Sequence, residues 1–118
     1  MSRLTAGTIV VVDWCGGSLP QEPGKLRRAV SVEDHELFPE EYPNILVAPL
    51  TRDEGLAHRS FAERIEPTSD NDADTTCWAL AHHVTSVSLR RVKPTASWIT
   101  AEQLSSIRKR IIVAIGAA

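Results

Sequence analysis

The segment TIVVVDW at residues 8–14 largely decides how this sequence folds. It is β-branched and apolar almost throughout, which is typical of a strand that is buried on both faces. Gly7 precedes the segment, and the turn-forming residues CGGSLP follow it at 15–20. The segment is therefore the predicted first strand of a mainly β fold.

Further strands are predicted downstream, between polar loops at 34–43 and 66–75. These strands are RAVSV at 28–32, NILVAPL at 44–50, a weaker strand at 59–65, CWALAHHV at 77–84 and a last strand at 86–92. Neighbouring residues of a strand point to opposite faces. Only one of His82 and His83 is therefore expected to enter any given site.

A single helix is predicted at residues 100–115. The sequence TAEQ from Thr100 to Gln103 has the spacing of a capping box, and Gly116 occupies the position of a C-terminal stop. The apolar residues that recur at helical spacing are Leu104, Ile107, Ile111, Ala114 and Ile115. The predicted fold class is thus mainly β (α+β), a small antiparallel barrel with a C-terminal helix docked on it.

Length and composition limit the class of protein. The 118 residues, 42% hydrophobic and 24% charged, indicate one soluble globular domain over residues 1–118. The net charge of −2 means that any nucleic-acid site must be a local basic patch. Cys15 and Cys77 are too few for a disulfide framework, and no apolar stretch suits a secretory signal or a membrane span. We expect a cytoplasmic protein with no membrane partner.

Common catalytic and cofactor motifs are missing from the sequence. There is no HExxH, CxxC, GxGxxG, P-loop or GxSxG pattern, so neither a metal nor a cofactor is expected. The remaining candidates are the basic segment GKLRR at 24–28 and Thr51, which follows a predicted strand. Taken alone, the first usually marks a solvated strand start and the second a turn.

The order of these segments is more informative than any one of them. GTIVVVDW at 7–14 resembles the opening strand of the MazF/PemK toxins, ribonucleases of bacterial toxin–antitoxin pairs. RRAVSV at 27–32 and APLT at 48–51 resemble the family's arginine-led strand and its strand ending in threonine. ALAHHVTSV at 79–87 resembles A-L-A-[DE]-Q-[VI]-[KR]-[ST]-[IV], and residues 99–116 resemble the closing helix. The resemblance spans nearly the whole chain and implies an SH3-like, PemK-type barrel.

The sequence departs from the family pattern at two places. PQEPG at 20–24 replaces the loop S-E-Q-x-G, and Arg28 stands where proline is usual. Both Arg27 and Arg28 are therefore candidates for the family's arginine, and counting back from the next alanine favours Arg27. His82-His83 replace the acid–glutamine pair.

The resemblance implies RNA cleavage without a metal, in which the ribose 2′-OH attacks the adjacent phosphorus. Arg27 would clamp the phosphate, because its planar guanidinium gives two charge-assisted hydrogen bonds. Thr51 would position the same group, and Glu22, ionised at neutral pH, would serve as base. Taken alone, Glu22 is more simply a solvated loop carboxylate.

Four further residues are expected to bind RNA: Lys25, Arg28, Trp14 and His83. Trp14 follows the first strand and could stack on an unpaired base, although a core tryptophan is the simpler interpretation.

The resemblance also implies the partners. These are single-stranded RNA (messenger, transfer or ribosomal), an antitoxin peptide or protein, and a second copy of the chain. Two alternatives remain open at this stage. One is a non-enzymatic toxin like CcdB that binds gyrase; the other is an inactive relative that binds RNA or antitoxin without cutting.

Overall fold

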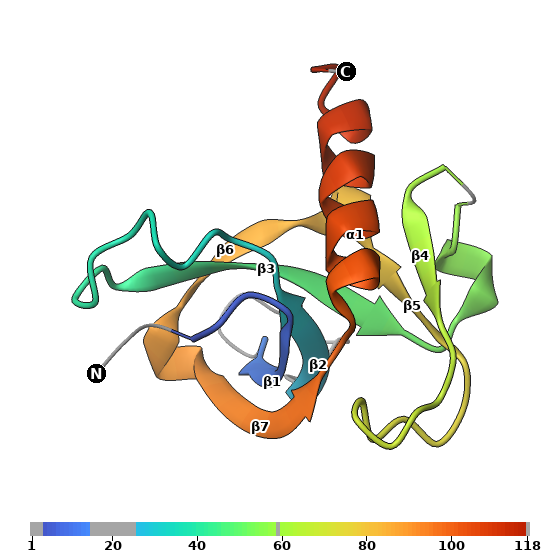
Figure 1. Ribbon diagram of the computed structural model, residues 1–118, viewed down its shortest axis with the longest axis horizontal. Helices are drawn as coiled ribbons and strands as arrows, with labels where there is room; N and C mark the ends of the chain where they lie inside the picture. Colours follow the sequence, from blue (N-terminus) through green and yellow to red (C-terminus); the bar gives the residue numbers. More distant parts are fainter. Residues whose placement is uncertain (1–3, 15–25, 59, 118) are drawn as a thin grey trace, which may run out of the picture.

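The computed structural model describes residues 4–14, 26–58 and 60–117, which form an antiparallel sheet and one α-helix (Figure 1). The strands are β1 (Thr8–Asp13), β2 (Leu26–Ser31), β3 (Asn44–Thr51), β4 (Ala62–Ile65), β5 (Cys77–Leu80), β6 (Thr85–Ser88) and β7 (Val92–Trp98). Short 3₁₀ helices lie at η2 (Glu54–Leu56), η3 (Ala81–His83) and η4 (Leu89–Arg91), and the helix is α1 (Ala101–Ala114). The predicted fold class, antiparallel strands followed by a C-terminal helix, is confirmed.

Strand β1 lies between β2 and β7 and pairs with both. Its side chains alternate between two apolar clusters: Ile9 packs in one, and Val10 and Val12 pack in the other. All three are at most 1% exposed. The prediction that this strand is buried on both faces is confirmed, and it ends at Asp13, one residue before the predicted limit.

Strand β3 joins the two parts of the sheet. One edge pairs with β2, and the other pairs with both β5 and β6. The strands form a strongly curved sheet (Figure 1), but no ladder joins β6 to β7 among the described strands. The sheet is therefore strongly curved without closing into a complete barrel.

The strand predicted at 77–84 is wrong in its second half. β5 ends at Leu80, and η3 follows. Leu50 of β3 pairs with Ala79 of β5, and Val47 of β3 pairs with Thr85 of β6. An advance of three residues along β3 therefore corresponds to six residues along the segment that runs from β5 to β6. The three extra residues are taken up by η3. The expectation that His82 and His83 point to opposite faces of a strand fails with it.

Three other strand predictions need correction. The strand predicted at 86–92 is β6, which ends at Ser88, and β7 was not predicted as a separate strand because most of its side chains are exposed and it contains Pro94. The weak strand predicted at 59–65 begins only at Ala62, whose N–H donates to the carbonyl of His58 in a turn. The strand predicted at 28–32 begins two residues earlier, at Leu26, and ends at Ser31.

Helix α1 begins and packs as its sequence indicates. Thr100 accepts a hydrogen bond from the Gln103 N–H at 3.0 Å, and Gln103 Oε1 accepts one from the Thr100 N–H at 2.9 Å, which confirms the capping box. Ile107 is fully buried in the core. Arg108 fixes the helix to the sheet by donating to the carbonyls of Val32 and Glu33 at 2.9 and 3.0 Å.

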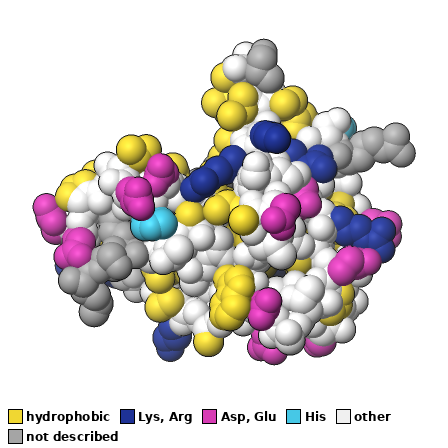
Figure 2. Space-filling model, in the orientation of Figure 1, with side chains coloured by type: hydrophobic (Ala, Val, Ile, Leu, Met, Phe, Trp, Pro, Cys, Tyr) yellow, Lys and Arg dark blue, Asp and Glu magenta, His cyan; other side chains and the backbone are white. Residues whose placement is uncertain are grey.

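The apolar stripe of α1 is shorter than predicted. Leu104 and Ile111 pack on the core, but Ala114 and Ile115 are exposed. Figure 2 shows hydrophobic side chains gathered at this free end of the helix, where Ile112 and Val113 are also exposed. Acidic and basic side chains are interspersed over the same view, in keeping with the small net charge. No helix in the described ranges has the length and apolar character needed to cross a membrane.

The capping box gives a test of the fold. Thr100→Ala should lower the free energy of unfolding by about 1 kcal/mol, because the Gln103 N–H loses its acceptor. Thr100→Ser should retain most of the stability, since it keeps the hydroxyl. Ser105→Ala, an exposed change on the same helix, is the control and should be neutral or slightly stabilising. Equal urea midpoints for Thr100→Ala and wild type would contradict the assigned cap.

Candidate functional site

A cleft of about 440 Å³ opens where β2 begins and β3 ends. It is bounded on its third side by the loop that leads into β5. We call it the large cleft. Its lining consists of Leu26, Arg27, Arg28, Leu50, Thr51, Arg52, Asp53, Ala73, Asp74, Thr75 and Cys77.

A second cavity of about 260 Å³, here called the small hollow, shares part of this lining. Its residues are Trp14, Arg27, Pro49, Leu50, Thr51, Leu56, Leu80, His83 and Thr85. Arg27 and Thr51 therefore border both spaces, although they are 24 positions apart in the sequence. A guanidinium and a hydroxyl held side by side form a pair of donors suited to a phosphate group.

Most of the site residues predicted from sequence come together here. Arg27, Arg28 and Thr51 line the large cleft, and Trp14 and His83 line the small hollow. Glu22 and Lys25 lie outside the described residues. The structure thus places five of the predicted residues around one connected region.

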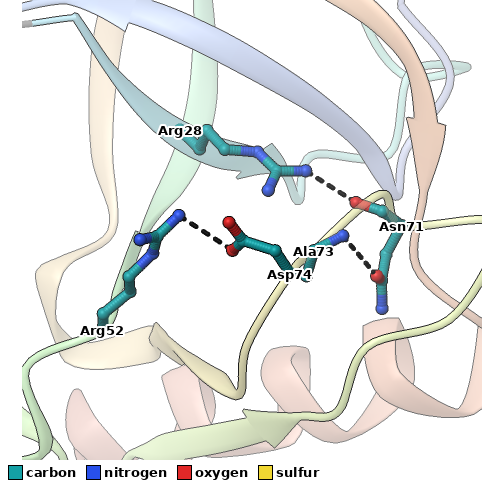
Figure 3. A network of polar contacts seen from close by, with 5 residues as sticks. All are labelled: Arg28, Arg52, Asn71, Ala73 and Asp74. Atoms are coloured by element: carbon teal, nitrogen blue, oxygen red, sulfur yellow. Dashed lines mark hydrogen bonds and ion pairs between the residues drawn. The ribbon is translucent and has the colours of Figure 1, made fainter.

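The two neighbouring arginines of β2 differ in their surroundings. Arg27 is exposed, whereas Arg28 is half-buried and its Nη2 donates to the backbone carbonyl of Asn71 at 2.6 Å (Figure 3). Among the described residues no carboxylate lies within ion-pair distance of Arg27. Arg27 is thus available to a ligand, while Arg28 is bound to the loop before β5, which forms one wall of the large cleft.

That wall is organised by a single buried side chain. Asn71 is 1% exposed, and its Oδ1 accepts hydrogen bonds from the N–H groups of Thr68 and Ala73, both at 3.0 Å. Its Nδ2 donates to the Glu66 carbonyl at 2.8 Å. The side-chain amide of Asn71 therefore ties three points of the loop together, and the backbone carbonyl of the same residue accepts the hydrogen bond from Arg28.

A third arginine, Arg52, completes the rim of the large cleft. Its Nη2 lies 3.0 Å from Asp74 Oδ1, and both side chains are mostly exposed (Figure 3). An exposed pair of this kind contributes little to stability. Its consequence is that Asp74 neutralises one of the three positive charges around the cleft.

Thr51 is held in place by the turn that follows it. Its Oγ1 accepts a hydrogen bond from the Asp53 N–H at 3.0 Å, and Asp53 in turn caps η2 by accepting from Gly55 at 2.9 Å. A hydroxyl that accepts one hydrogen bond can still donate its proton. Thr51 can therefore donate to a ligand oxygen in either cavity.

Histidines gather at the edge of the small hollow. The rings of His82 and His83 lie edge-to-face at 4.3 Å, and Phe61 joins His82 to His58 at ring distances of 5.4 and 5.0 Å. Partial burial and the neighbouring His83 and His58 lower the pKa of His82. His82 is accordingly a neutral ring at neutral pH.

Cys77 lines the large cleft without being a suitable nucleophile. It is buried, and desolvation raises the pKa of its thiol despite the opposing charges of Arg28 and Arg52. The reactive form of cysteine is the thiolate, so this thiol is unreactive at neutral pH. In the described part of the chain, no three His, Cys, Asp or Glu side chains converge to hold a metal ion.

Sequence reasoning missed Arg52, Asn71 and Asp74. Arg52 directly follows Thr51, so its position next to a predicted site residue was a usable signal. Asn71 and Asp74 lie in the segment EPTSDNDADT, whose composition indicates only a loop. Their roles depend on contacts with Arg28 of β2 and with Arg52, which follows β3, and both contacts span more than 20 positions of the sequence.

The buried amide of Asn71 gives a test of this wall. Asn71→Ala should lower the free energy of unfolding by about 2 kcal/mol or more, because several backbone groups lose their partner at once. Ser69→Ala, in an exposed position of the same loop, should change it by less than about 0.5 kcal/mol. Equal chemical-denaturation curves for the two variants would show that the loop does not depend on Asn71.

Comparison with known proteins places this geometry in a family. The family model described as PemK-like, MazF-like toxin of type II toxin–antitoxin system matches residues 5–115. No curated protein matches the sequence.

Solved structures of such toxins have the same fold. MazF from Deinococcus radiodurans (Form-I) is 18% identical with a TM-score of 0.72, and the match covers 96% of each chain. The MazE–MazF structure (Form-II) of that organism is 19% identical with a TM-score of 0.74, covering 98% of this chain and 97% of that chain. Mycobacterium tuberculosis toxin MazF-mt6 is 14% identical with a TM-score of 0.71, covering 94% of this chain and 98% of that chain. The chain therefore belongs to the PemK-like, MazF-like toxins of type II toxin–antitoxin systems.

Proposed function

We propose that this chain is an endoribonuclease that cuts single-stranded RNA without a metal ion. The observation that carries the proposal is the joint position of Arg27 and Thr51 at the border of both cavities. A mycobacterial structure with a TM-score of 0.66 at 10% identity, covering 100% of this chain and 98% of that chain, is described as an endoribonuclease in complex with its cognate antitoxin. The substrate would be messenger, transfer or ribosomal RNA in the cytoplasm, and residues 1–118 would act as one domain.

The residues divide the chemistry among them. Arg27 places two donors on the phosphate whose negative charge grows as the 2′-oxygen attacks, and Thr51 donates a third hydrogen bond. Glu22, five positions before Arg27, is the proposed base, on the strength of the family pattern. Trp14 lines the small hollow and would stack on a flanking base, and Lys25 and Arg28 would add positive charge.

The matched pair of Arg27 and Arg64 tests this assignment. Arg27→Ala should reduce cleavage of a long RNA in EDTA by about 100- to 1000-fold, the usual cost of losing one transition-state donor. Arg27→Lys should recover only part of the rate, since a point charge cannot reproduce bidentate contacts. Arg64→Ala is the control: it removes the same charge from an exposed residue on β4, outside both cavities, and should keep the wild-type rate.

Thr51→Val keeps the shape of the side chain and removes the hydroxyl. It should slow cleavage by about 10- to 100-fold, which corresponds to one hydrogen bond to a charged group. Mass analysis of the product ends should show a 2′,3′-cyclic phosphate. Wild-type rates in both Arg27→Ala and Thr51→Val would remove the pair from the mechanism. No cleavage by wild type together with tight gyrase binding would favour a non-enzymatic toxin instead.

We also propose that the protein acts as a homodimer and that an antitoxin binds it. The exposed apolar side chains at the end of α1 support an association surface, and the MazE–MazF structures have the same fold as this chain. Sedimentation at micromolar concentration should give a particle of about 26 kDa, twice the chain mass of 13.0 kDa. A single 13.0 kDa species at that concentration would contradict the dimer.

A further inference from the structure

We propose that His83 is a catalytic residue, the general acid that protonates the 5′-oxygen as it leaves the scissile phosphate. The inference rests on the proposed ribonuclease function and assigns the one step of that reaction which Arg27, Thr51 and Glu22 leave without a group. It starts from the position of His83 in the small hollow, which it shares with Arg27 and Thr51.

The small hollow contains few groups able to exchange a proton near neutral pH. Arginine stays charged at every physiological pH, and the hydroxyls of Thr51 and Thr85 and the indole of Trp14 are far too weakly acidic. Histidine changes its charge between pH 5 and 8. Among the described lining residues, His83 is therefore the group suited to giving up a proton during turnover.

The large cleft supplies no better acid. Asp74 is ion-paired with Arg52, and Asp53 accepts the Gly55 N–H that caps η2. Both are carboxylates, which are ionised at neutral pH and have no proton to give. Burial raises the pKa of the Cys77 thiol, and Cys77 does not line the small hollow.

The backbone explains why an imidazole reaches this position. The three-residue mismatch between the β3–β5 and β3–β6 ladders is taken up by η3, which buries Ala81 completely and leaves His82 and His83 exposed. The small hollow is lined by Leu80 and Thr85 on either side of that turn. A regular strand would have sent the two histidines to opposite faces, whereas the 3₁₀ turn keeps both on the outside.

The groups that surround His83 are two further imidazole rings and one guanidinium. His82 faces it within η3, His58 lies beyond Phe61 in the same series of rings, and Arg27 stands across the small hollow. Partial burial, together with the neighbouring His83 and His58, lowers the pKa of His82.

Two arginines of α1, which packs on η3, are engaged elsewhere. Arg110 of α1 lies 3.1 Å from Glu63 of β4, and Arg108 donates to backbone carbonyls. Neither competes for the imidazole of His83.

The proposed step balances as follows. The base takes the proton of the 2′-OH, the 2′-oxygen forms a bond to phosphorus, and the bond from phosphorus to the 5′-oxygen breaks. Protonated His83 gives its proton to that 5′-oxygen, so a neutral hydroxyl leaves, and solvent restores the proton afterwards. In the family pattern that the sequence resembles, glutamine stands at this position, and an amide cannot transfer a proton in this way.

The test uses His83→Gln, which keeps the hydrogen-bonding capacity and removes the acid. After the cut site has been mapped on a long RNA, a short RNA is made with sulfur in place of the bridging 5′-oxygen at that bond. Thiolate leaves without needing a proton. His83→Gln should cleave the normal RNA about 100-fold or more slowly than wild type, and the sulfur-substituted RNA at nearly the wild-type rate.

Two further measurements separate acid catalysis from a structural role. The wild-type rate should fall as pH rises through the range in which imidazole loses its proton, and His83→Gln should lack that fall. Binding of an RNA with 2′-O-methyl at the cut site should stay within about threefold of wild type. His58→Ala removes an exposed imidazole from the far end of the ring series and should keep the wild-type rate.

The outcomes distinguish the two proposals. Equal slowing of both RNAs by His83→Gln, or an unchanged pH profile, would overturn the role of His83 while leaving the ribonuclease proposal intact. Failure of wild type to cut any RNA would overturn the ribonuclease proposal itself, and the role of His83 with it.

Discussion

The rest of the structure depends on the backbone hydrogen bonds along both edges of β3. This strand pairs with β2 on one side and with β5 and β6 in succession on the other. Its side chains Ile45, Val47 and Ala48 are at most 1% exposed, so the ladder is held in one register by burial on both faces. That register brings Arg27, Thr51 and His83 to one region, because Thr51 ends β3 while Arg27 and His83 lie in the two elements beside it, β2 and η3.

Charge in the site is arranged locally, within a molecule whose net charge is only −2. Three arginines surround the large cleft, but Arg28 is bound to the Asn71 carbonyl and Arg52 to Asp74. Arg27 differs from both because, among the described residues, its guanidinium is bound neither to a backbone carbonyl nor to a carboxylate. A weakly charged surface with one available guanidinium in a cleft favours recognition of a single phosphate over general attraction to nucleic acid.

The sequence predicts the elements whose signals are local. The apolar run of β1 and the capping box at Thr100 are readable because burial on both faces and helix capping each leave a pattern within a few residues. The turn η3 was missed because it results from the difference in register between the β3–β5 and β3–β6 pairings. The strand β7 was missed because most of its side chains are exposed. Asn71 was missed for the same reason: its burial is set by contacts that no window of sequence contains.

The backbone hydrogen bonds of the sheet fix the fold, and the side chains around the two cavities lie outside that pairing. This separation explains how the family keeps one fold at 10–19% identity. Backbone hydrogen bonds form between main-chain groups whatever the side chains are. Residues at the rim of the cavities can therefore change without altering the strand register of β3. A rim position on η3 is held by the backbone whether it carries glutamine or histidine. Replacing an amide by an imidazole there changes which proton transfers the site can perform while leaving the positions of Arg27 and Thr51 intact. The chemistry of such a toxin is therefore set by a few side chains on a scaffold that does not depend on them.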